Sequence, residues 1–173
     1  GRDWNVATGM VIEGKAGFQI MGDWAKGEFT AAGKVPGVDY YCAATPSNNG
    51  YLYNVDSFIF YKSSDPDKQA GQQLLAKLMM GKNFQKVFNL YKGSIPARLD
   101  VSMDEFDKCA KTSNADIKTA GAKGGLVPSF AHGMAQGNTM KAALQDIITE
   151  HFNSDMSSVD AANALADSVL ANM

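Results

Sequence analysis

The sequence predicts an α/β fold that is rich in helix and has an incomplete sheet. Three observations point to this class. Apolar residues recur at helical spacing in most segments, the strand-like runs are few and short, and helices separate these runs from one another. With 173 residues, 45% of them hydrophobic, the chain is long enough to bury the core of one ordinary domain.

Apolar periodicity predicts helices along the whole chain. In order they cover residues 3–13, 23–32, 66–80, 83–91, 103–111, 138–152 and 157–170. Asp23, Asn138 and either Ser157 or Ser158 are candidate N-caps, because their side-chain oxygens can accept from the first free N–H groups. The helix after residue 65 has the clearest start, since Ser64 or Asp65 can cap it and a proline follows at the first helical position.

Short apolar and aromatic runs predict the strands. These runs are residues 18–21, 38–43 and 51–61. The sequence PSNNG at 46–50 is a turn signal between the last two runs, and residues 121–125 form a glycine-rich loop. Three or four such strands could not easily close a sheet alone, so the predicted sheet is incomplete.

Composition and charge exclude several classes of function. The formal net charge is −2, which provides no basic field for nucleic acid and no lysine-rich face for anionic lipid. No apolar run approaches the length that is needed to cross a bilayer. No GxSxG, HExxH, CxxC or phosphate-loop motif occurs, so the sequence predicts no metal and no cofactor.

Two cysteines, Cys42 and Cys109, are too far apart in sequence for a CxxC redox or zinc motif. Cys42 lies in a strand-like run and Cys109 lies on a predicted helix. They are either two buried thiols or one structural disulfide in an oxidising compartment, and the residues alone leave both readings open.

Two tryptophans and three polar residues stand apart from the apolar pattern. Trp24 begins a helix just past an apolar run, which suits it to line a cleft and to contact the C–H face of a sugar ring. Trp4 is the other tryptophan. Asp56, Lys92 and His132 lie at element ends or in loops and can supply hydrogen bonds around the two rings. Aromatic plates with a polar rim are typical of a carbohydrate pocket.

Each of these residues also has an ordinary structural interpretation. Trp24 could pack against a loop, Asp56 could cap a turn, and a lysine is usually solvated. Two other functions therefore stay open. One is an enzyme that uses Asp56, Lys92 and His132 on a carbohydrate, although glycosidase chemistry needs a second carboxylate and Asp56 has no obvious partner. The other is a helical interaction module whose aromatic residues all belong to the core.

Four motifs follow one another along the chain. They are residues 14–24 (GKAGFQIMGDW), 53–58 (YNVDSF), 92–98 (KGSIPAR) and 128–133 (PSFAHG). In this order they resemble the periplasmic sugar-binding proteins of ABC transporters, extracellular solute-binding protein family 1, and most closely the glucose/mannose-binding branch. The resemblance covers nearly the whole chain, and its specificity lies in the combination of motifs.

The resemblance implies a periplasmic-binding-protein-like fold and a protein that captures a ligand without turning it over. In that branch two tryptophans stack on the sugar, while an aspartate, a lysine and a histidine hydrogen-bond its hydroxyls. The matching positions are Trp4, Trp24, Asp56, Lys92 and His132. Residues at positions like Cys42 and Cys109 form a disulfide in some members. The implied ligand is a monosaccharide such as glucose or mannose, the implied partner is an ABC permease, and the implied location is the periplasm.

Members of that family are more than twice as long as this chain. The resemblance therefore implies a C-terminal portion, with the missing N-terminal portion of the same protein as a further partner. It assigns residues 1–61 and 99–173 to the second lobe. Residues 62–98 form an excursion into the first lobe that includes the hinge crossings. The apolar faces of that excursion are then expected to be exposed.

Overall fold

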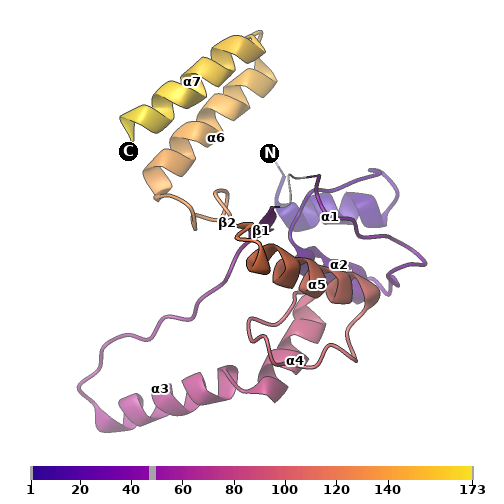
Figure 1. The fold of residues 1–173 in the computed structure, drawn as a ribbon, viewed down its shortest axis with the longest axis vertical. Coiled ribbons are helices and arrows are strands. Elements are labelled where there is room, and N and C mark those ends of the chain that lie inside the picture. Colours follow the sequence, from indigo (N-terminus) through magenta and orange to yellow (C-terminus); the bar gives the residue numbers. More distant parts are fainter. Residues whose placement is uncertain (1, 47–49, 173) are drawn as a thin grey trace. The chain divides into compact units, whose positions relative to one another are not determined.

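The computed structural model describes residues 2–46 and 50–172. Helices make up most of this part of the chain (Figure 1). In order they are α1 (Trp4–Ile12), the 3-10 helix η1 (Asp23–Ala25), α2 (Lys26–Ala31), α3 (Pro66–Met79), α4 (Lys82–Lys92), α5 (Lys108–Ala122), α6 (Asn138–Asn153) and α7 (Ser158–Ala171). Two strands, β1 (Tyr51–Tyr53) and β2 (Leu126–Pro128), complete the elements of the described residues.

The two strands form a small parallel sheet. Tyr51 pairs with Leu126, Leu52 with Val127 and Tyr53 with Pro128. The Ser129 N–H continues the ladder by donating to the Tyr53 carbonyl at 2.8 Å. Together with the excess of helix, this short sheet confirms the predicted α/β class with an incomplete sheet.

The chain divides into two compact units. The first comprises residues 2–46 and 55–124, and contains α1 to α5. The second comprises residues 50–54 and 125–172, and contains the sheet with α6 and α7, which run side by side (Figure 1). The lobe boundaries that the resemblance implies, at 61/62 and 98/99, stay a prediction.

Local signals define the best-formed helix ends. The Asp65 carboxylate caps α3 by accepting from the N–H groups of Asp67 and Lys68, and Pro66 takes the first position as predicted. Ser157 caps α7 through the Asp160 N–H. Helix α4 ends at Gly93, whose φ of +89° is left-handed and favours glycine.

The predicted strands are mostly absent from the described residues. Residues 18–21 and 38–43 form no strand, and only Tyr51–Tyr53 of the run 51–61 is one. The apolar side chains of these runs are not buried either, since Phe18 is 95% and Ile59 is 78% exposed. A strand needs a neighbouring strand to take its N–H and C=O groups. Among the described residues of these runs only 51–53 pairs with another strand, while Tyr40 makes a single isolated bridge to Pro36.

Several predicted helix starts also differ from the structure. The helix predicted over 103–111 begins at Lys108, is capped by Asp107, and runs to Ala122, which includes the first two residues of the predicted glycine loop 121–125. The N-cap residue of α6 is Gly137, one residue before Asn138. Asp23 is not an N-cap, because its carboxylate accepts from the distant Ile95 N–H. Side chains that pair over long distances in sequence leave no local pattern.

The core of the first unit lies around the start of α5. Val101, Phe106 and Ala110 are buried together, and three half-buried apolar residues pack on them: Leu90, Ile95 and Met103. Because Ile95 and Leu90 flank the end of α4, this core supports the segment that carries Lys92.

Candidate ligand-binding site

Trp24 lies in η1 with its side chain half-buried. Its indole folds back over Gly22, two residues earlier, so that a Cβ atom at Gly22 would clash with the ring carbon Cζ3. Only a residue without a side chain leaves room for the ring in this position. Gly22 therefore determines where the indole lies. In the sequence, the preceding apolar run alone predicts the place of Trp24 and assigns no role to Gly22.

Asp23 joins η1 to the segment that follows α4. Its Oδ2 accepts from the Ile95 N–H at 2.9 Å, across 72 positions in sequence. Burial raises the pKa of Asp23 above its ordinary value; the Ile95 hydrogen bond, Lys26, Ser94 and Lys92 oppose this shift. The Ser94 oxygen is buried beside the carboxylate and makes no hydrogen bond of normal geometry with the described residues.

Two glycines bring α2 and the end of α4 into backbone contact. A Cβ atom on Gly27 would meet the Lys92 carbonyl oxygen at 2.8 Å, and one on Gly93 would meet the Gly27 nitrogen at 2.6 Å. No side chain fits between these backbones without a shift of the main chain. The contact places the last turn of α4, and Lys92 with it, against the start of α2.

Lys92 and Asp56 form an ion pair. The Lys92 ammonium lies 2.5 Å from Asp56 Oδ2 and 5.8 Å from the centre of the Phe88 ring. Lys92 also stands in the last turn of α4, where the helix dipole favours a cation. The structure thus brings together two of the predicted site residues, 36 positions apart in sequence.

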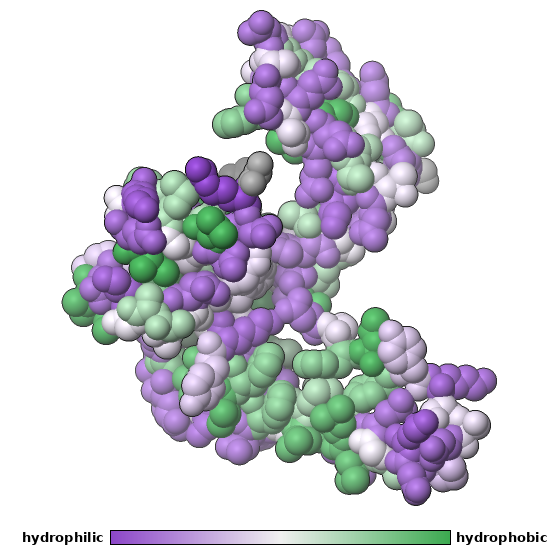
Figure 2. All heavy atoms as spheres, turned by 180° about the vertical axis from the view of Figure 1, so that it is seen from behind, coloured by the Kyte–Doolittle hydropathy of each residue, from purple (hydrophilic) through white to green (hydrophobic). Residues whose placement is uncertain are grey.

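Lys92 stands at the edge of an apolar groove on α4. The lining residues are Phe84, Val87, Phe88, Tyr91 and Lys92. Phe84 and Phe88 stack with ring centres 5.5 Å apart. Apolar residues gather over the α3 and α4 region at the bottom of Figure 2, and Leu74, Leu78 and Tyr91 are each at least 60% exposed.

Trp4 is the first residue of α1, and its side chain is exposed. Its carbonyl oxygen accepts from Thr8 Oγ1 at 2.9 Å and from Gln19 Nε2 at 3.0 Å. The Gln19 bond ties the connection between α1 and η1 back to the start of α1. Trp4 and Trp24 both lie in the first unit, where α1 and η1 each contact α2.

His132 belongs to the second unit, in the turn after β2. Its Nδ1 lies 2.6 Å from the hydroxyl oxygen of Ser129, which is almost fully buried. This contact orients an otherwise exposed imidazole. The other four predicted site residues all lie in the first unit.

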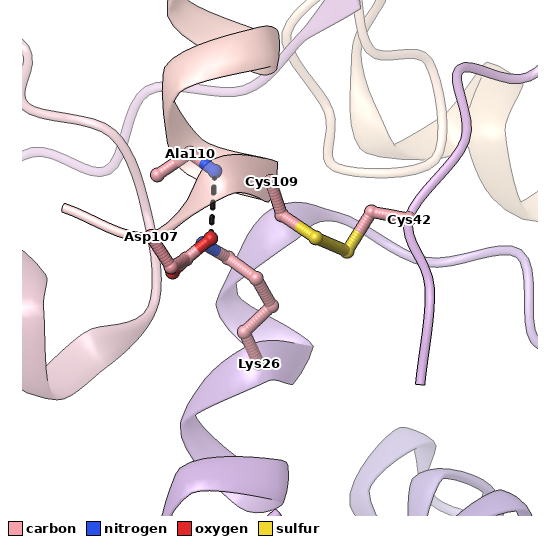
Figure 3. The surroundings of a disulfide bond; sticks show 5 residues. All are labelled: Lys26, Cys42, Asp107, Cys109 and Ala110. Atoms are coloured by element: carbon pink, nitrogen blue, oxygen red, sulfur yellow. Dashed lines mark hydrogen bonds and ion pairs between the residues drawn. A yellow bond between two sulfur atoms is a disulfide. The ribbon is translucent and has the colours of Figure 1, made fainter. Parts of the chain in front are cut away.

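A disulfide joins Cys42 to Cys109, with Cα atoms 5.6 Å apart, in the pairing that the resemblance implies (Figure 3). Beside it Lys26 reaches from α2 to Asp107 Oδ2 at 2.8 Å, while Asp107 Oδ1 accepts from the Ala110 N–H. Burial would raise the pKa of Asp107, but the Lys26 ammonium and the α5 N–H groups together hold it below its ordinary value.

Sequence reasoning missed Lys26 and Asp107, and it read Asp23 as a cap. A lysine near the start of an amphipathic helix is expected to be solvated, whereas Lys26 is only 6% exposed in the structure.

Among the described residues no group of three or more His, Cys, Asp or Glu side chains is placed to hold a metal ion. No helix in that part of the chain is long and apolar enough to cross a membrane.

No protein-family model matches the chain. It is 48% identical over 170 residues to a "probable sugar-binding periplasmic protein" of Brucella suis, covering 98% of this chain and 40% of that protein. An uncharacterized ABC transporter extracellular-binding protein of Pyrococcus horikoshii is 35% identical over 86% of the chain and 33% of its own length. A xylose/arabinose-binding protein, XacG, of Haloferax volcanii is 28% identical over 92% of the chain and 34% of its own length.

The chain is therefore a relative of proteins named as sugar-binding and as extracellular-binding components of ABC transporters. The homology extends over nearly all of this chain, which spans about 40% of the length of the Brucella protein. The relatives' names describe binding proteins, not enzymes.

Proposed function

We propose that this chain is part of the sugar-binding component of an ABC transporter, which captures a monosaccharide in the periplasm and delivers it to a membrane permease. The observation that carries the proposal is the 48% identity to a probable sugar-binding periplasmic protein over 98% of the chain. A C-terminal position in the whole protein follows from the resemblance, and the N-terminal portion completes the cleft.

The proposed ligand contacts are Trp4, Trp24, Asp56, Lys92 and His132. Two features of the first unit support them. The Trp24 indole is held over Gly22 with part of its surface accessible, as a stacking ring requires. Asp56 and Lys92 present an acceptor and a donor side by side. A sugar hydroxyl can donate to the Asp56 carboxylate and accept from the Lys92 ammonium, and so replace the direct ion pair.

Glucose or mannose is the proposed sugar, because the four motifs resemble the glucose/mannose-binding branch most closely. An aldopentose is the second candidate, since one relative is named for xylose and arabinose. Vicinal hydroxyls occur in both classes, so the Asp56 and Lys92 pair alone does not separate them. The extra hydroxymethyl group of a hexose has to be accommodated by other residues of the cleft.

The test is isothermal titration calorimetry of the protein at its natural length with D-glucose, D-mannose, D-xylose and L-arabinose. We expect one of the hexoses to bind at least about tenfold more tightly than either pentose, with no product formed during prolonged incubation. Preferred binding of a pentose would overturn the hexose assignment alone. Failure to bind any of the four sugars would overturn the proposed function, and turnover of the bound sugar would favour the enzyme alternative.

A further inference from the structure

We infer that Asp23 is a positioning residue of the sugar site. Its carboxylate holds the segment after α4 against η1, and this attachment keeps Trp24 and Lys92 in one fixed arrangement. The inference rests on the proposed function and deepens it, because Asp23 is not one of the proposed sugar contacts.

The chain connectivity makes Asp23 suitable for this role. Asp23 directly precedes Trp24 and shares η1 with it. Its partner Ile95 comes three residues after Lys92. One hydrogen bond of 2.9 Å therefore links the backbone that carries the indole to the backbone that carries the ammonium group.

A second attachment lies between Lys92 and Ile95, at Gly93. The backbones of Gly27 and Gly93 approach so closely that a Cβ atom on either would lie within 2.8 Å of the other segment. A single attachment would leave the two segments free to swing about it. The carboxylate bond and the glycine contact together remove that freedom, and the side chain of Ile95 is packed on the core beside them.

The surroundings of Asp23 have opposing effects on its charge. Burial raises the pKa of its carboxyl above the ordinary value, while the Ile95 N–H, the Lys26 ammonium, the Ser94 hydroxyl and the Lys92 ammonium oppose that shift. Lys26 is itself fixed by its ion pair with Asp107. The Lys92 ammonium lies in the field of Asp23, but its direct contact is with Asp56. The link from Asp23 to Lys92 therefore runs through the Ile95 N–H, which an asparagine oxygen can also accept.

Substitutions at Asp23 separate the hydrogen bond from general stability. Asp23→Ala removes the acceptor of the Ile95 N–H, whereas Asp23→Asn keeps an acceptor oxygen of similar reach. Asp39→Ala is a matched control, because Asp39 Oδ2 also accepts a backbone N–H, that of Val35 at 2.7 Å, and Asp39 is exposed. The protein at its natural length is titrated with D-glucose and D-mannose for each variant.

We expect Asp23→Ala to weaken the affinity for the preferred sugar about tenfold or more, and Asp23→Asn and Asp39→Ala to change it by less than about threefold. A mutant cycle distinguishes this role from a general effect on stability. It compares the loss of affinity caused by Asp23→Ala in the wild type with the loss in a protein that already carries Trp24→Ala and Lys92→Ala. If Asp23 acts through those two residues, Asp23→Ala should have almost no further effect on affinity in the second protein. Full affinity in Asp23→Ala, or an undiminished loss in the doubly substituted background, would overturn the inference.

Hydrogen exchange of the sugar-free protein tests the attachment independently of binding. Peptides that cover residues 20–30 and 92–98 should both exchange faster in Asp23→Ala and at the wild-type rate in Asp23→Asn and Asp39→Ala. If the wild-type protein binds neither sugar, the proposed function fails and this measurement decides the positioning role. Unchanged exchange in Asp23→Ala would then overturn it.

Discussion

At the scale of single residues, the position of Trp24 depends on the absence of a side chain two residues earlier, at Gly22. The indole occupies the space in which a Cβ atom of Gly22 would lie. Trp24→Ala should weaken sugar binding by about 1–3 kcal/mol, the range for a lost aromatic anchor. Titration calorimetry measures the loss, and Trp24→Phe is the control because it keeps an aromatic face. Equal affinity of the alanine variant and the wild type would exclude stacking on this ring.

Asp107 is the residue whose charge should matter most for acid stability. Its pKa is lowered in the native state, so its contribution is present above the ordinary carboxyl pKa of 3.8 and is lost as the pH falls through the native value. Asp107→Asn should cost about 2 kcal/mol at neutral pH, because the buried Lys26 ammonium loses its counter-charge. As the pH falls from 3.8 through the lower native pKa of Asp107, the variant and the wild type should converge.

Urea unfolding between pH 7 and pH 2 measures this difference in the free energy of unfolding. Asp104→Asn is a suitable control, since Asp104 is exposed and meets a hydroxyl, not a buried cation. A gap between wild type and Asp107→Asn that stays constant over the whole range would contradict the assigned direction of the pKa.

At the scale of elements, the disulfide attaches a segment without regular structure to a helix. Residues 33–46 contain neither helix nor strand, and Cys42 joins them to the first turn of α5. Phe29 and Tyr40, with ring centres 4.2 Å apart, provide a second attachment. Burial and the nearby Asp107 raise the pKa of Tyr40 to about 12, which keeps its hydroxyl neutral.

Removing the bridge should destabilise the first unit substantially. It closes a loop with a sequence separation of 67, for which the chain-entropy model gives roughly 4 kcal/mol. The paired substitution Cys42→Ser with Cys109→Ser should lower the free energy of unfolding by that order, as measured in urea. Addition of a reductant should lower the wild type to the level of the variant and leave the variant unchanged. A wild type that is insensitive to reductant would show that the bridge contributes little.

At the scale of the whole molecule, α3 and α4 expose more apolar surface than an isolated soluble chain usually does (Figure 2). The chain covers 40% of the length of its Brucella relative, and we propose that the remaining portion covers these helices. The 173-residue chain alone should therefore self-associate or bind a separately produced N-terminal portion. Leu74→Gln with Leu78→Gln, on the exposed face of α3, should reduce that association.

Light scattering after size exclusion tests this expectation. A monomer of 18.5 kDa that binds no hydrophobic dye would show that the apolar faces of α3 and α4 are covered within the chain. The same result for the wild type and the glutamine variant would show that α3 does not drive the association.

Local chemistry made part of this fold predictable. The cap at Asp65, the proline after it and the cap at Ser157 are contained within four or five residues, and the structure has each of them. The four motifs likewise indicated the sugar-binding relatives, because the order of residue types along the chain can be compared without knowing which residues are in contact. Asp56 and Lys92 were named from the sequence, whereas their direct ion pair was not.

Tertiary structure decided the features that depend on partners far along the chain. The apolar runs 18–21 and 38–43 had strand character but no neighbouring strand, so they stay irregular in the structure. Asp23 and Ile95 are 72 positions apart, and Lys26 and Asp107 are 81 apart. Sequence by itself determined the locally capped helix starts at Asp65 and Ser157, the motifs and the kinds of group present. Which carboxylate meets which cation or amide was decided by tertiary structure, because burial and pairing exist only once distant segments pack together.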